Sequence, residues 1–220
     1  MVSCRGVQHA LLTLCLLLLA SANPLRAQVG PAVAPLASNA ADYENRYDIF
    51  AGFDYAHFNG IGHGHSTGLY GWNAQTTAWI KPIFGFAASV RGQYGNYPVT
   101  PNTIGITTPP ISQYQFLLGP DFRLWRSPRH ALGFHVLLGG VYGKFDSGLK
   151  SAPPNSLGLY TNQLAFASAS GGSFDFNLSP TLSVRVIADF APTRFGNGSQ
   201  REFSGSAGVV YKLGSLHRSK

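Results

Sequence analysis

The sequence has almost no cysteine. Only Cys4 and Cys15 occur in its 220 residues, and both fall within residues 1–27. This segment has the composition of an export signal peptide, because the basic Arg5 precedes an apolar stretch and the small residue Ala27 stands at the expected cleavage point. The mature chain would then contain no thiol, which excludes disulfides, thiolate metal sites and cysteine nucleophiles.

Long apolar runs and dense charge are also missing. The longest apolar stretch, at 10–20, is shorter than the roughly 20 residues that a membrane-spanning helix needs. Charged residues make up 11% of the chain, a low fraction for a soluble surface. The net charge is +7, but the bases are scattered and their densest group is at 126–130. We therefore expect no nucleic-acid partner.

Alternation of apolar and polar residues dominates the rest of the chain. An Ala/Pro-rich lead-in at 28–45 precedes it, and a basic tail at 214–220 follows it. Between them, 46–213 divides into eight segments with a period of two, which predicts eight β-strands. The expected strands are 47–56, 69–80, 84–94, 113–125, 131–142, 163–177, 182–190 and 203–213.

The two faces of these strands differ in residue size. In the first strand, Tyr47, Ile49 and Phe53 share one face, whereas Asp48 and Asp54 share the other. An eight-stranded barrel has a lumen only wide enough for side chains, so bulky stripes belong outside it. The pattern predicts an all-β, eight-stranded antiparallel up-and-down transmembrane β-barrel in the outer membrane. The alternative is a soluble barrel with its apolar face inside.

The connections between the strands are alternately long and short. Short turns with proline are expected near Pro82, Pro128 and Pro180, and long loops at 58–68, 97–112, 144–162 and 194–201. Outer-membrane barrels have short periplasmic turns and long extracellular loops, which places both termini in the periplasm. Within the fourth strand, Pro120 predicts a bulge or a local break because proline cannot donate to the ladder.

Three sequence stretches resemble a known family. They are Gly71-Trp72-Asn73, the run from Phe174 to Ser179, and the run from Val184 to Phe190. Together with the eight-strand layout over 46–213, they are similar to the OmpA-like outer-membrane β-barrel domain. The resemblance implies assembly by the barrel assembly machinery. Family members usually end in a terminal aromatic residue, whereas the last strand here ends near Leu213 before the basic tail.

The inward face carries nearly balanced charges. Unpaired charges in a narrow lumen would be costly to desolvate, so we expect them to form a structural network that blocks the lumen. Arg185 and Asp189 are the expected pair on the seventh strand. The expected interior charges are Asp48, Asp54, Arg91, Asp121, Arg123, Asp175, Arg185, Asp189 and Lys212.

No cofactor motif is present, and we expect neither a cofactor, nor a metal, nor catalysis. His57, His63 and His65 leave open a transition-metal site in the first long loop. The expected role is that of a structural or surface-binding component acting through extracellular loops, with outer-membrane lipid, including lipopolysaccharide, as a partner. The sequence does not identify an extracellular ligand. A lipid-modifying acyl hydrolase or transferase, or a narrow channel, remains the alternative.

Overall fold

The computed structural model describes residues 43–59, 66–99, 105–150, 152–196 and 200–216. Within these ranges the chain forms almost only β-strands, together with one short 3₁₀ helix. No helix among them is long and apolar enough to cross a membrane. The elements are β1 (Tyr47–Asn59), β2 (Ser66–Lys81), β3 (Phe84–Asn96), β4 (Pro110–Arg126), β5 (His130–Lys144), η1 (Pro154–Leu157), β6 (Gln163–Asn177), β7 (Leu182–Phe190), β8 (Thr193–Arg194) and β9 (Phe203–Leu213).

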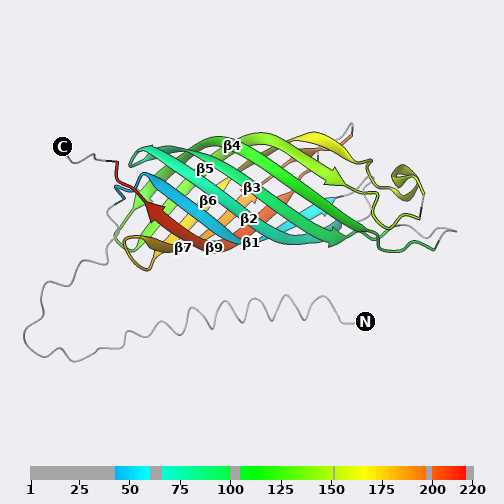
Figure 1. The fold of residues 1–220 in the computed structure, drawn as a ribbon, viewed down its shortest axis with the longest axis horizontal. Coiled ribbons are helices and arrows are strands. Elements are labelled where there is room, and N and C mark those ends of the chain that lie inside the picture. Colours follow the sequence, from blue (N-terminus) through cyan, green and yellow to red (C-terminus); the bar gives the residue numbers. More distant parts are fainter. Residues whose placement is uncertain (1–42, 60–65, 100–104, 151, 197–199, 217–220) are drawn as a thin grey trace, which may run out of the picture. The chain divides into compact units, whose positions relative to one another are not determined.

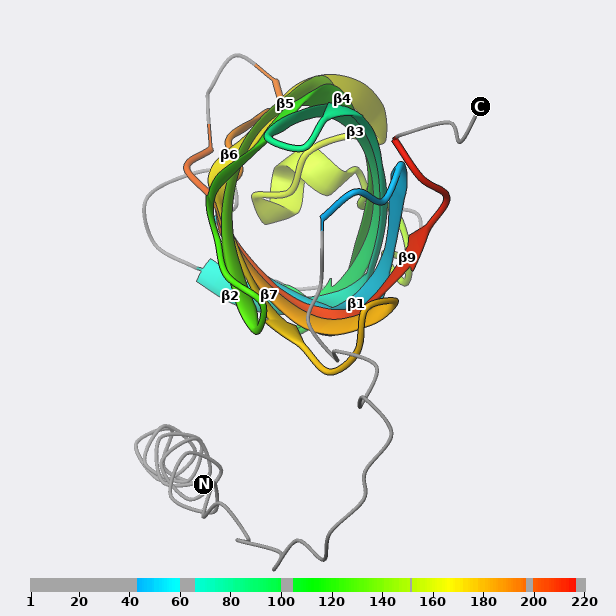
Figure 2. The ribbon, with the colours of Figure 1, turned by 90° about the vertical axis from the view of Figure 1, so that its left-hand side faces the viewer.

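The strands close into an antiparallel barrel, as the sequence predicts (Figures 1 and 2). Each long strand pairs with its neighbours in sequence, and β1 pairs with β9 to complete the ring, from Tyr47 opposite Leu213 to His57 opposite Phe203. The two-residue β8 continues along β6 in the same register as β7, after an interruption at Ala191 and Pro192. Eight long strands therefore form the wall, and no sheet edge remains open.

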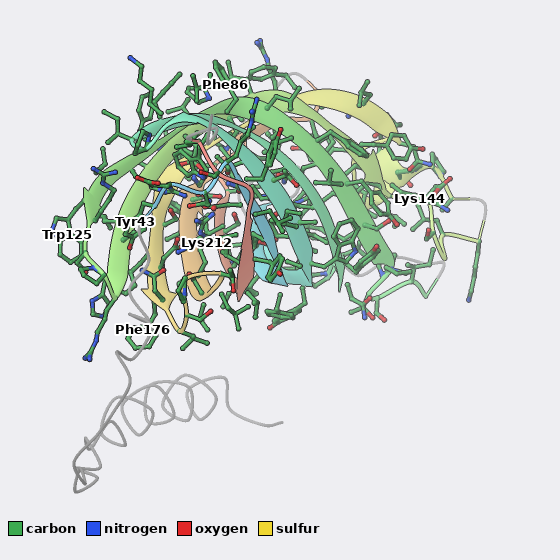
Figure 3. All side chains as sticks on the ribbon, turned by 60° about the vertical axis from the view of Figure 1, so that its left-hand side comes forward. Tyr43, Phe86, Trp125, Lys144, Phe176 and Lys212 are labelled. Carbon is green, nitrogen blue, oxygen red and sulfur yellow. The ribbon has the colours of Figure 1, made fainter. Side chains whose placement is uncertain are left out.

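The wall is apolar outside and polar inside. Large side chains such as Phe86, Trp125 and Phe176 project from its outer surface (Figure 3). Each exposed charged side chain within the described strands is the last residue of its strand: Lys81, Arg126, Lys144 and Arg194. Between these rims the outer face carries no charge, as hydrocarbon requires.

Short and long connections lie at opposite ends of the barrel (Figure 1). The turns at 82–83, 127–129 and 178–181 share one end with the start of β1 and the end of β9. The first five strands are longer than the pattern predicts, whereas β6, β7 and β9 have the predicted bounds. Because β1 reaches Asn59 and β2 begins at Ser66, the first loop is shorter than expected. Backbone pairing does not require lipid-facing residues, so the ladder continues after the alternation stops.

The predicted irregularity at Pro120 takes a milder form. Leu118 pairs with Leu138 and Asp121 with His135, so the register between β4 and β5 is the same on both sides of the proline. Gly119 and Pro120 have partners on β3 instead. The register shift lies further along β4, between Arg123 and Trp125.

The closing seam between β1 and β9 is very tight. Gly52 and Gly208 are opposite each other, and a Cβ atom at Gly208 would lie 2.2 Å from the carbonyl oxygen of Ala51. At Gly205 on the same strand, the nearest atom to an added Cβ would be 3.9 Å away. Closure of the ring therefore depends on a glycine at one position of β9 and not at the other.

We predict that Gly208→Ala destabilises the closed barrel by roughly 1–3 kcal/mol, because the added methyl group overpacks the seam. A closed barrel migrates faster on a detergent gel before boiling than after it. The temperature at which the fast band disappears should fall for Gly208→Ala and stay near the wild-type value for Gly205→Ala. A wild-type transition in Gly208→Ala would contradict the tight seam.

Candidate functional site

All nine predicted interior charges are buried in the lumen. They come from six of the eight long strands, and each is at most 5% exposed. Strand parity places them there, since every one shares the inward face of its strand. The structure adds a sixth acid, Glu202, which sequence reasoning did not include, and the buried His135.

A four-residue cluster occupies the turn end of the lumen. Arg185 donates two hydrogen bonds to Asp175, from Nε to Oδ1 at 2.5 Å and from Nη2 to Oδ2 at 2.7 Å. The same Nη2 lies 2.9 Å from Oδ2 of Asp48, and Arg123 Nη2 lies 3.2 Å from that oxygen. At the turn end of the lumen, the charges of two bases and two acids thus neutralise each other.

Arg185 does not pair with Asp189, contrary to the expectation from sequence. Four residues along one strand span about 13 Å, beyond the reach of an ion pair. Asp175 is directly opposite Arg185 on the neighbouring β6 and is the closer partner. Asp189 instead binds Arg91 Nη2 at 2.5 Å, and its other oxygen lies 2.9 Å from Nε2 of His135.

Side chains that precede β1 close the turn end. Arg123 stacks 3.7 Å above the Trp79 ring and 5.3 Å from the Tyr43 ring. The Tyr43 hydroxyl lies 2.6 Å from the Ser127 carbonyl oxygen and accepts a hydrogen bond from Asn177 Nδ2. Figure 3 shows Tyr43 and Lys212 near each other at this end. Tyr43, at the end of the lead-in, together with Trp79 and Arg123 covers the turn end of the lumen, and we call these three side chains the floor. Residues 28–42 of the lead-in lie outside the described residues.

Amides and hydroxyls fill the middle of the lumen. Asp54 accepts from Ser206 Oγ at 2.6 Å and from Gln93 Nε2. Arg91 donates to Ser204 Oγ at 2.9 Å. Gln113 donates to Gln93 and, at 3.2 Å, to Glu202. This network joins inward-facing side chains of β1, β3, β4 and β9.

An aromatic lid closes the loop end. Phe145 contacts the rings of Phe58, Tyr160 and Phe195 at centroid distances of 6.0, 5.8 and 5.3 Å. Leu157 and Leu159, in and after η1, are buried in the same cluster. Figure 2 shows η1 within the outline of the barrel mouth. The sequence predicted a loop at 144–162 but not that this loop covers the lumen. The one feature of the sequence that indicates a lid is a group of large apolar residues at irregular spacing.

Glu202 lies beneath the lid, just before β9. It accepts hydrogen bonds from Thr193 Oγ1 at 2.5 Å and Gln113 Nε2 at 3.2 Å, and no base pairs with it among the described residues. Complete burial raises the pKa of Glu202 from its ordinary 4.5 to about 7. A carboxyl group with this pKa is largely neutral in mild acid. Its charge acts on the lid residue Tyr160, because the pKa of that hydroxyl is raised by burial first, then by Tyr97 and by Glu202.

The possible metal site cannot be placed. His63 and His65 lie outside the described residues, and His57 is half-buried on β1. The described ranges contain no group of three or more His, Cys, Asp or Glu side chains arranged to hold a metal. The features that the structure does bring together are the charge cluster, the floor and the lid.

Solved structures with the same fold are outer-membrane proteins. Ail, the attachment invasion locus protein of Yersinia pestis, is 16% identical, with a TM-score of 0.53 over 77% of this chain and 99% of its own. OprG from Pseudomonas aeruginosa is 12% identical, with a TM-score of 0.55 over 79% of this chain and 97% of its own. Ail in complex with the heparin analogue sucrose octasulfate gives a TM-score of 0.51 at 16% identity.

No protein-family model and no curated protein sequence matches the chain. The fold is that of small outer-membrane β-barrels, and the predicted resemblance holds at that level; an OmpA-like family membership is not shown.

We predict that the lid loosens as pH rises. The pKa of Glu202 is higher in the folded lid than in an unfolded one. The stabilisation that its neutral carboxyl group gives to the closed lid is therefore complete below about pH 4.5 and is lost between pH 4.5 and 7. Above pH 7 the ionised carboxylate costs the closed lid about 3 kcal/mol. Amide hydrogen exchange at 145–160, corrected for intrinsic rates, should be faster at pH 8.5 than at pH 5.5.

Glu202→Gln should remove this pH dependence, because an amide stays neutral throughout the range. Asp146→Asn, which neutralises an exposed acid of the same loop, should retain it. Exchange that depends on pH equally in wild type and Glu202→Gln would contradict the role of Glu202.

Proposed function

We propose that this protein is an exported, integral outer-membrane barrel that binds extracellular molecules through its loop end and carries out neither transport nor catalysis. Its outer wall supports membrane insertion, since exposed charges occur only at the strand ends. The signal-like segment at 1–27 supports export. The barrel assembly machinery is the proposed partner for insertion.

The packed side chains at both ends of the lumen are the observation that carries the proposal. Tyr43, Trp79 and Arg123 stack across the turn end, and the Phe145 cluster covers the loop end. Between them, the charged and amide side chains occupy the narrow interior. These contacts support a role in which a solute outside the cell binds at the loops and the rim of the barrel.

The loop end is basic. Lys144, Lys150, Arg194 and Arg201 are exposed there, against the single exposed acid Asp146 among the described loop residues. Such a surface attracts polyanions by electrostatic steering. Ail, which shares the fold, was solved with a heparin analogue. We propose sulfated polysaccharides as the class of extracellular ligand.

We predict that the full-length protein in detergent binds immobilised heparin, and that Lys150→Gln/Arg194→Gln elutes at lower salt. The matched control is Lys81→Gln/Arg126→Gln, which removes the same charge from the turn end. Its elution should stay close to that of wild type. Equal shifts for both double variants would show that binding follows net charge and would contradict a binding face at the loops.

The channel alternative makes a different prediction for the same preparation. A lumen closed at both ends should give no reproducible single-channel steps in a planar bilayer. Such steps in the wild-type protein would overturn the closed-lumen part of the proposal, whereas loss of heparin binding would overturn only its ligand.

A further inference from the structure

An open groove of about 640 Å³ lies on the outer wall at the loop end of β2, β3 and β4. Thr67 and Gly68 of β2, Asn96 of β3 and Ser112 of β4 line it, together with Ser147 from the segment after β5. None of the nine interior charges lines it, and it meets the buried cluster of the lid at Ile111. Its place is the upper edge of the charge-free wall, where the hydrocarbon of an outer leaflet gives way to head groups.

A row of tyrosines runs along the wall at the lower edge of this groove. Tyr55 is directly opposite Tyr70, Tyr70 is opposite Tyr94, and Tyr114 is opposite Tyr142, so the row crosses β1 to β5. The rings of Tyr94 and Tyr114 meet edge to face at 5.8 Å. Tyr70 and Tyr94 also line the groove itself.

The far wall lacks these hydroxyls. At the loop ends of β6, β7 and β9, the outward residues are Leu164, Phe166, Phe190 and Phe203. Phe190 and Phe203 are opposite each other, with ring centroids 5.3 Å apart. The barrel therefore has one face with phenol groups at the head-group level and one without them, although both faces are equally able to contact acyl chains.

The groove combines open backbone with polar groups. Gly68 has no room for a side chain, because a Cβ there would lie 2.8 Å from the ring of Tyr55. Thr67 Oγ1 donates to the carbonyl oxygen of Asn96 at 2.7 Å, which leaves its own oxygen free to accept. The exposed Lys144 is opposite Ser112 and therefore lies beside the groove. The exposed Asp146 follows two residues later, so the negative charge of its carboxylate offsets the positive charge beyond this edge.

We propose that this groove binds the phosphorylated sugar head group of an outer-leaflet glycolipid of the lipid A type. The tyrosine rings offer apolar faces to the sugar and hydroxyls to its polar groups. Lys144 pairs with a phosphate, and the acyl chains descend along the charge-free wall below. A free sugar phosphate would lack that wall contact, which is why a membrane glycolipid is the occupant. The site does not depend on the proposed loop function and stands if heparin binding fails.

Binding of purified lipid A to the full-length protein in detergent tests the proposal, with native mass spectrometry as the readout. Loss of two ring contacts in Tyr70→Ala/Tyr94→Ala should weaken binding about tenfold. The matched control, Phe190→Ala/Phe203→Ala on the far wall, should bind as wild type does. Tyr70→Phe/Tyr94→Phe keeps the rings, and should fold normally and bind a few-fold more weakly.

The phosphate is tested separately. Lys144→Gln should weaken binding of bis-phosphorylated lipid A several-fold and leave dephosphorylated lipid A unaffected, while Arg194→Gln on β8 should change neither. Equal losses in the groove and far-wall variants would overturn the proposal. So would displacement of lipid A by an equal concentration of phosphatidylglycerol, since the groove would then bind any anionic lipid.

Discussion

The ion cluster around Arg185 is the interaction on which the rest of the structure depends. An eight-stranded ring encloses only enough space for side chains, so any charge inside it is removed from water and must find a partner. Arg185 meets that requirement by joining Asp175 on β6 to Asp48 on β1. Because β6 and β1 are not neighbours in the wall, this guanidinium on β7 joins two strands that share no backbone pairing. The cluster fixes the cross-section of the barrel at the turn end.

The same constraint explains why the two ends are closed differently. At the turn end the Arg123 guanidinium belongs to the ion cluster and also makes cation–π contacts with the rings of Trp79 and Tyr43. The floor is therefore continuous with the ion cluster. At the loop end the interior charges stop at Glu202, and packed rings around Phe145 take over. With the lumen filled along its length, the surfaces left for binding are the basic loop rim and the outer wall. The proposed functions belong to these surfaces.

The sequence predicts the faces of this barrel well and the contacts between them poorly. Strand parity alone places Asp48, Arg91 and Lys212 inside, because a period of two leaves each side chain only two directions. Partner choice depends on which residue lies opposite on the next strand, and no periodicity within one segment reveals that register. The expected Arg185–Asp189 pair is wrong for this reason. Phe145 and Leu157 follow no period in a long loop, and Tyr43 precedes the first strand, so the lid and the floor had no pattern from which to be predicted.

A double-mutant cycle on Arg185 and Asp175 tests the central claim most directly. The free energy of unfolding in urea would be measured in lipid micelles for wild type, Arg185→Gln, Asp175→Asn and the double variant. Removing the guanidinium alone leaves Asp175 buried without its base and should cost roughly 3–5 kcal/mol, whereas the double variant should cost less than Arg185→Gln. Losses in the single variants that simply add in the double variant would show that the pair does not hold the lumen together.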